Sequence, residues 1–174
     1  DKDRKLTAYA QFRDNNESED ADIEQRLLDG EDPEMIMLRQ RSLNDETERN
    51  LLVQSDYVHP FSKDGKFEAG FRSTFRRIST NYLVEEQDSV GIWNNLVNFT
   101  NDFRYTENVH AVYGLIANRH GKVSYQAGLR AELSDIQTLL LQTDETNDRL
   151  YANLFPSIHA NYHLNETHSW QVSY

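Results

Sequence analysis

The chain has 174 residues, 18 Lys and Arg against 29 Asp and Glu for a net charge of −11, and no cysteine. It therefore forms no disulfide, zinc–thiolate site, iron–sulfur cluster or thiol nucleophile. The pI near 4.9, with no segregated basic patch, argues against a nucleic-acid partner. Mean hydropathy is −0.80, and no apolar run approaches the roughly 18 residues of a spanning helix. An α-helical membrane protein is excluded, whereas the strands of a membrane β-barrel average to such hydrophilic values.

The negative charge is concentrated near the N-terminus. Residues 14–34 contain ten acidic residues and a single base, Arg26, which gives this segment −9 of the total −11. Such a run is typical of a solvated, self-repelling loop. A cation site is the alternative, but the acids do not follow the alternate positions around a glycine that a calcium loop requires. We therefore predict a long acidic loop.

Seven strands are predicted from side chains that alternate between apolar and polar with a period of two. In chain order they cover 6–12, 51–57, 67–75, 99–117, 123–134, 154–162 and 170–174. The alternation is cleanest at 67–75, 109–117 and 125–133, and each window has the length of about 9 residues that a tilted transmembrane strand needs. The expected fold class is all-β, an antiparallel up-and-down meander of about seven long strands.

The connections between these strands alternate in length. Tight turns are predicted at 60–66, 119–122 and 165–168, and long polar loops at 14–34, 77–98 and 135–149. In a meander every second connection lies at the same rim, so the long loops share one rim and the tight turns the other. An outer-membrane barrel has this asymmetry, with short periplasmic turns and longer extracellular loops.

In such a barrel each strand turns one face to lipid and the other to the lumen. The predicted lipid-facing residues are Phe67, Phe71, Tyr113, Leu115, Tyr125, Leu129, Leu133, Ile158 and Trp170. The predicted lumen-facing residues are Arg72, Arg76, Gln126, Arg130, Glu132, His159 and His163. Aromatic residues near the tight turns, among them Tyr57, Tyr125, Tyr162 and Trp170, are candidates for an interfacial girdle.

The long loops supply the candidate binding residues, Tyr82 and Trp93. Periodicity alone also fits a soluble or surface-exposed antiparallel β module that binds a glycan or a protein. The same two aromatic residues would then make the contacts. The long apolar faces count against that alternative, because a second layer would have to cover them.

No motif of a nucleotide-binding, serine-hydrolase or zinc-protease site occurs, and no catalytic residue is predicted. His159 and His163 share a face, but four residues of extended strand separate them by about 13 Å, too far to bind one metal ion. We expect no enzymatic activity, no cofactor and no metal.

Four short strings occur together along the chain: DYVHPF at 56–61, ENVHAVY at 107–113, GLRAE at 128–132 and NLFPS at 153–157. In this order, with the alternating connections between them, they resemble the outer-membrane β-barrel family of TonB-dependent-receptor-like proteins. The similarity runs from about residue 50 to the end and more loosely before that.

This resemblance implies a protein of the Gram-negative outer membrane that takes up an unidentified extracellular solute. It also implies a closed barrel of more than 20 strands, a plug domain in the same parent chain and a TonB-type partner that supplies energy through the plug. The sequence contains no segment that resembles a plug, and its seven predicted strands are too few to close a barrel. Residues 1–174 are therefore expected to be an interior part of the barrel, surrounded by outer-membrane lipid.

Overall fold

The computed structural model of the chain describes residues 4–26, 36–165 and 167–174. Its strands are β1 (Lys5–Arg26), β2 (Ile36–Pro60), β3 (Lys66–Gln87), β4 (Trp93–Asn95), β5 (Asn101–His120), β6 (Val123–Leu140), β7 (Glu145–His163) and β8 (Ser169–Ser173). They form one antiparallel sheet in the order β1-β2-β3-β5-β6-β7-β8, and β4 pairs only with the end of β3. This confirms the predicted meander.

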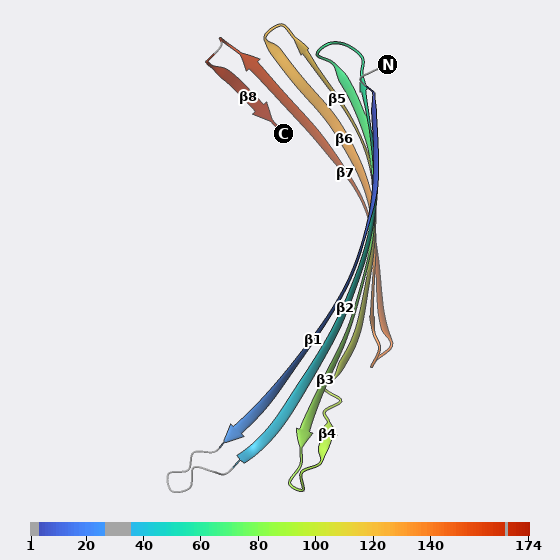
Figure 1. Cartoon of the computed structure of the whole chain (residues 1–174), viewed down its shortest axis with the longest axis vertical. Coiled ribbons are helices and arrows are strands. Elements are labelled where there is room, and N and C mark those ends of the chain that lie inside the picture. The colour runs from blue at the N-terminus through green and yellow to red at the C-terminus, as the bar shows by residue number, and fades with distance from the viewer. Residues whose placement is uncertain (1–3, 27–35, 166) are drawn as a thin grey trace.

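The sheet is a long, twisted and curved single layer (Figure 1). The tight turns lie at one end, together with the start of β1 and the end of β8. At the other end β1 finishes, β2 begins, β3 leads into β4, and β6 turns into β7. We call this second end the hairpin end. Within the described residues no helix is long and apolar enough to cross a membrane.

The predicted long loops are wrong in extent, because strands occupy most of them. Residues 14–26 belong to β1, and the rest of the acidic loop up to Glu34 lies outside the described residues. Between β3 and β4 only residues 88–92 are turn, and between β6 and β7 only residues 141–144. The apolar alternation stops in these segments because both faces carry polar side chains. The ladder of backbone hydrogen bonds nevertheless continues through them, because it does not depend on side-chain polarity.

The tight turns lie where they were predicted. Between β2 and β3 the Phe61 amide donates to the Gly65 carbonyl at 3.0 Å. Between β5 and β6 the turn consists of Gly121 and Lys122, and Gly121 has φ +59°, a backbone conformation that glycine adopts without steric cost.

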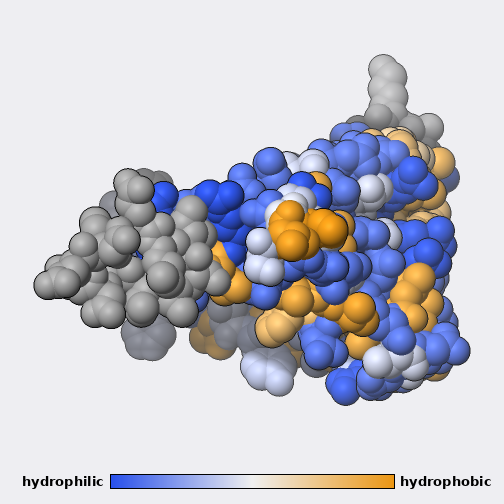
Figure 2. Space-filling model, turned by 90° about the horizontal axis from the view of Figure 1, so that it is seen from below, coloured by the Kyte–Doolittle hydropathy of each residue, from blue (hydrophilic) through white to orange (hydrophobic). Residues whose placement is uncertain are grey.

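The sheet has almost no core of its own. Among the described residues the only buried apolar side chains are those of Leu52 and Ala111, with 9% and 4% of their surface exposed. Figure 2 shows many apolar residues at the surface of the sheet instead. Large apolar side chains such as Val112 at 59% and Ile158 at 56% stay exposed. A single layer therefore needs a second medium or a second layer against its apolar face.

Candidate functional site

The register of the strands decides which side chains share a face. Side chains directly opposite each other on paired strands point to the same side. Phe71 is paired with Val112, and Val112 with Ala131, which defines the apolar face. One residue along, Arg72 is paired with Ala111, and Ala111 with Glu132, which defines the polar face.

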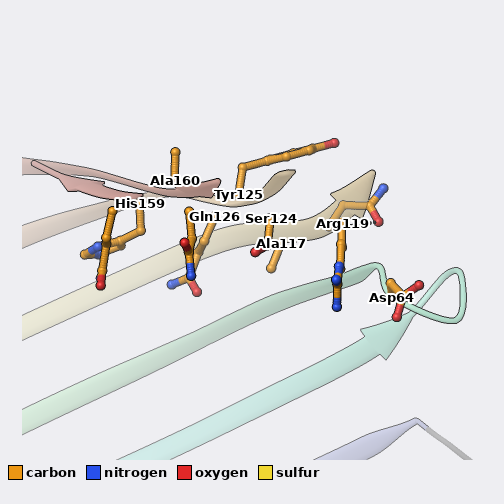
Figure 3. Close-up of a pocket in the computed structure, with 11 residues that line it drawn as sticks. Asp64, Ala117, Arg119, Ser124, Tyr125, Gln126, His159 and Ala160 are labelled. Carbon is orange, nitrogen blue, oxygen red and sulfur yellow. Dashed lines mark hydrogen bonds between the residues drawn. The ribbon is translucent and has the colours of Figure 1, made fainter. Parts of the chain in front are cut away.

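The polar face carries every residue that the sequence predicted to line a lumen. They are Arg72 and Arg76 of β3, Gln126, Arg130 and Glu132 of β6, and His159 and His163 of β7. Figure 3 shows the division of the two faces at the tight-turn end of the sheet. Gln126, His159 and Arg119 project from one side of the ribbons, and Tyr125 and Ala160 project from the other.

Seven of the nine predicted lipid-facing residues lie on the apolar face and are exposed: Phe67, Phe71, Tyr125, Leu129, Leu133, Ile158 and Trp170. The other two are corrected by the register. Tyr113 is paired with Gly70 and Arg130, and Leu115 with Glu68 and Gly128, so both lie on the polar face. The side chains that β5 turns to the apolar face are instead Val112 and Ile116, both exposed.

Glycines on the neighbouring strands explain why these two large side chains fit on the polar face. A Cβ added to Gly70 would lie 2.6 Å from Cε1 of Tyr113 and 2.7 Å from the carbonyl oxygen of Ser55. A Cβ on Gly128 would lie 2.9 Å from Oγ of Ser157 and 3.2 Å from Cβ of Leu115. Each glycine thus leaves the space that the large side chain across from it fills.

The Tyr113 hydroxyl reaches across Gly70 to a carboxylate. It donates to Oδ1 of Asp56 at 2.6 Å, and Nε2 of Gln54 donates to Oδ2 of the same carboxylate at 2.9 Å. Tyr9 of β1 donates to Oε1 of Gln54 at 3.3 Å. The network ties β1, β2 and β5 together across the polar face.

Other charged side chains of the polar face form ion pairs. Nη2 of Arg130 lies 2.8 Å from Oε2 of Glu132, and Nε of Arg76 lies 2.6 Å from Oε1 of Glu48. Arg72, by contrast, is exposed and has no hydrogen bond or ion pair within the described residues. These pairs keep the polar face ionic without requiring a ligand, and Arg72 remains open to one.

A polar pocket of about 270 Å³ lies on this face at the tight-turn end, and Figure 3 shows its lining. Side chains of four strands contribute to it: Arg119, Gln126, His159, Asn161 and Gln171 among others. Oδ1 of Asn161 is buried without a hydrogen-bond partner in the structure. The pocket is thus lined by amides, an imidazole and a guanidinium, which are groups that bind polar chains by hydrogen bonds.

The two predicted binding aromatics differ in their surroundings. Trp93 lies in β4, and the guanidinium carbon of Arg41 stands 4.5 Å from its ring centroid, so one ring face is already covered. Tyr82 is not in a loop: it is part of β3, paired with Asn44 and Asn101 on the polar face. Its side chain is 37% exposed.

Two further aromatic residues join Tyr82 on the polar face at the hairpin end. Phe103 is paired with Thr80, and Tyr105 with Ile78, so both point to the same side as Tyr82. Sequence analysis missed this cluster because it assigned the odd residues of 99–117 to the apolar side of one strand. It also placed Tyr82 in a loop, and only the register of β3 with β5 brings the three aromatic residues onto one face.

The turn after β3 is organised by Asp88. Its Oδ1 accepts hydrogen bonds from the Ile92 amide at 2.9 Å and the Val90 amide at 3.0 Å, and Oδ2 accepts one from Asn94 at 3.2 Å. These bonds, that from Ile92 foremost, hold the pKa of the carboxyl below its ordinary value.

No cluster of three or more His, Asp and Glu side chains suited to a metal ion occurs among the described residues.

A single-layer meander with one apolar exposed face and one polar face is the arrangement of an outer-membrane β-barrel wall. The sequence profile of the outer membrane protein beta-barrel family matches residues 1–174, and the chain belongs to this family. The family places it in the outer membrane of a Gram-negative bacterium. No curated protein matches the sequence.

Among solved structures, the chain resembles the ferric citrate transporter FecA, crystallised in its unliganded form. The TM-score is 0.50 and the sequence identity 16%, over 94% of this chain. The chain spans 25% of the length of that structure. At this identity the likeness concerns the fold, and it agrees with the predicted meander as one part of a larger barrel.

Proposed function

We propose that residues 1–174 form part of the wall of an outer-membrane transporter of the TonB-dependent type, which takes up an extracellular solute. The observation that carries this proposal is the separation of an exposed apolar face from a polar face that bears hydrogen-bonding networks and open charged groups. Lipid covers the apolar face, and the polar face lines the lumen. In this orientation the hairpin end is extracellular.

The polar face offers contacts at both ends of the lumen. At the hairpin end Tyr82, Phe103 and Tyr105 form an aromatic surface suited to an incoming solute. At the tight-turn end the polar pocket with Arg119 and Asn161 is suited to a plug domain of the parent chain, through which a TonB-type protein would supply energy. No group of this wall is assigned a catalytic role, and no enzymatic activity is proposed.

The alternative of a soluble binding module is not favoured by the structure, because the described residues form one layer and leave the apolar face uncovered. Leu129 alone exposes 52% of its surface there. A soluble module of this kind would bury that face in a second sheet.

Uptake by the native bacterium tests the proposal. Strains with and without the parent gene are grown on ferric chelates, cobalamins or oligosaccharides as the limiting nutrient, with and without a protonophore. We expect one nutrient class to require both the gene and the proton gradient. If uptake of every nutrient is independent of the gene, or survives loss of the gradient, the transporter proposal fails.

The aromatic surface has its own test in the same assay. Tyr82→Ala is expected to lower uptake of that nutrient several-fold at unchanged amounts of protein in the outer membrane. Phe71→Leu, on the apolar face, is the matched control and should leave uptake at the wild-type rate.

A further inference from the structure

Three arginines lie together on the apolar face where the sheet approaches its hairpin end. Arg49 of β2 is directly paired with Arg77 of β3, and Arg77 with Thr106 of β5. Arg104 is two residues from Thr106 and therefore the diagonal neighbour of Arg77, at about 7–8 Å between backbones. Like charges directly opposite each other destabilise a sheet. An anion bound between the guanidinium groups would relieve this repulsion.

The acids nearby compensate only one of the three. Oδ2 of Asp14 lies 3.2 Å from Nε of Arg49. Arg77 and Arg104 are exposed and form no hydrogen bond or ion pair within the described part of the chain. Asp102, Asp135 and Asp148 share this face, Asp102 two residues from Arg104 along β5, but within the described residues none of the three forms an ion pair with Arg77 or Arg104. Two positive charges thus stay open.

The two open arginines line a common depression of about 510 Å³, together with Ser79, Thr106 and Gln137. Guanidinium groups match the geometry of phosphate oxygens and bind them with two parallel hydrogen bonds. Hydroxyl and amide groups beside them supply further donors. The depression has the chemistry of a phosphate site.

A path of apolar surface leads from this depression into the membrane-facing part of the sheet. The next hollow, about 260 Å³, is lined by Phe12, Leu51 and Phe75 as well as by Arg49 and Arg77. Beyond it lies an apolar groove of about 770 Å³, where small side chains leave room between large ones. Its lining includes Phe71, Val112, Ala131, Leu133, Ala152 and Leu154. Ser73 of this groove is four strand residues from Arg77, about 13 Å.

We propose that this face binds one acylated lipid with a phosphate head group, which sits on Arg77 and Arg104 while an acyl chain follows the apolar groove. Charge complementarity selects the anionic head, and the adjoining groove selects a lipid over a free anion. With the hairpin end outside, as proposed above, the lipid belongs to the outer leaflet. This assignment to a leaflet rests on the proposed function, whereas the binding itself does not.

Native mass spectrometry of the full-length parent protein in detergent tests the site. The probes are dioleoyl phosphatidic acid, dioleoylglycerol with the same chains but no phosphate, and inorganic phosphate. We expect the protein to retain phosphatidic acid and the double variant Arg77→Gln/Arg104→Gln to bind it about tenfold more weakly or worse, because each lost contact is charge-assisted. The control Arg72→Gln removes an open arginine from the polar face and should bind like wild type.

Equal retention of phosphatidic acid and dioleoylglycerol would overturn the proposal, as would an unchanged double variant. Displacement of the lipid by an equal concentration of inorganic phosphate would reduce the site to a free-anion site and also overturn it. If the double variant does not assemble, Arg104→Lys keeps the charge but loses the forked geometry, and it must still weaken binding.

Labelling of Ser79→Cys by a membrane-impermeant maleimide on intact cells, against the wild type, reports separately on orientation. Absence of labelling would contradict the orientation in the proposed function while leaving the lipid result as it stands.

Discussion

Replacement of Gly70 by alanine tests the polar-face packing most directly. The added Cβ would meet Cε1 of Tyr113 at 2.6 Å, Oδ1 of Asp56 at 2.7 Å and the carbonyl oxygen of Ser55 at 2.7 Å. Real Cβ atoms do not approach heavy atoms so closely, and the Ser55 carbonyl belongs to the backbone ladder of β2. Relief therefore requires strand movement, and overpacking of this kind costs about 1–3 kcal/mol.

Gly114→Ala provides a matched control within the same sheet. There the new Cβ would come no closer than 3.8 Å, to Cε2 of Phe67, which is ordinary contact. Gly128→Ala should be intermediate, because Oγ of Ser157 at 2.9 Å can rotate away but Cβ of Leu115 at 3.2 Å cannot. The expected order of destabilisation is Gly70, then Gly128, then Gly114.

The free energy of unfolding of the full-length parent protein in lipid vesicles, measured by urea titration, distinguishes these variants. A loss of about 1.4 kcal/mol at Gly70 corresponds to a tenfold shift of the unfolding equilibrium. Equal stability of the Gly70 and Gly114 variants would refute the argument that Gly70 makes room for Tyr113.

The remaining predictions concern the corrected strand, the carboxylate network and the turn. Val112→Arg, in the middle of the apolar face of β5, should cost about 2–4 kcal/mol in vesicles, whereas Ala117→Arg beside the polar pocket should be tolerated. Equal costs would contradict the assigned faces of β5. Tyr113→Phe removes the charge-assisted hydrogen bond to Asp56 and should cost about 1.5–3 kcal/mol in the urea assay, while Tyr125→Phe should be neutral. The pKa of Asp88 is lowered in the folded state, so its stabilisation of the turn is present above the unfolded value of 3.8 and is lost as pH falls through the folded value. Amide hydrogen exchange in this turn, corrected for intrinsic rates, should therefore speed up below that pH, and Asp88→Asn should abolish the pH dependence.

Sequence alone was sufficient for the meander, the tight turns and the faces of β3, β6 and β7. In these strands large apolar residues such as Phe71 and Leu129 alternate with charged residues such as Arg72 and Arg130. The period of two therefore allows only one assignment of the apolar and polar faces. Gly121 marks its turn for an equally local reason, since a positive φ favours glycine.

Tertiary structure decided the face of β5 and the length of the strands. Both sides of β5 carry apolar residues, Tyr113 and Leu115 on one and Val112 and Ile116 on the other, so its own alternation is ambiguous. The register with Gly70 and Gly128 on neighbouring strands resolves it, because only there is space for the large side chains. Likewise β1 and β3 extend past their apolar segments, because backbone pairing depends on the partner strand and not on the polarity of side chains. The arginine cluster on the apolar face also depends on strand pairing, because only the folded sheet brings Arg49, Arg77 and Arg104 together from three strands.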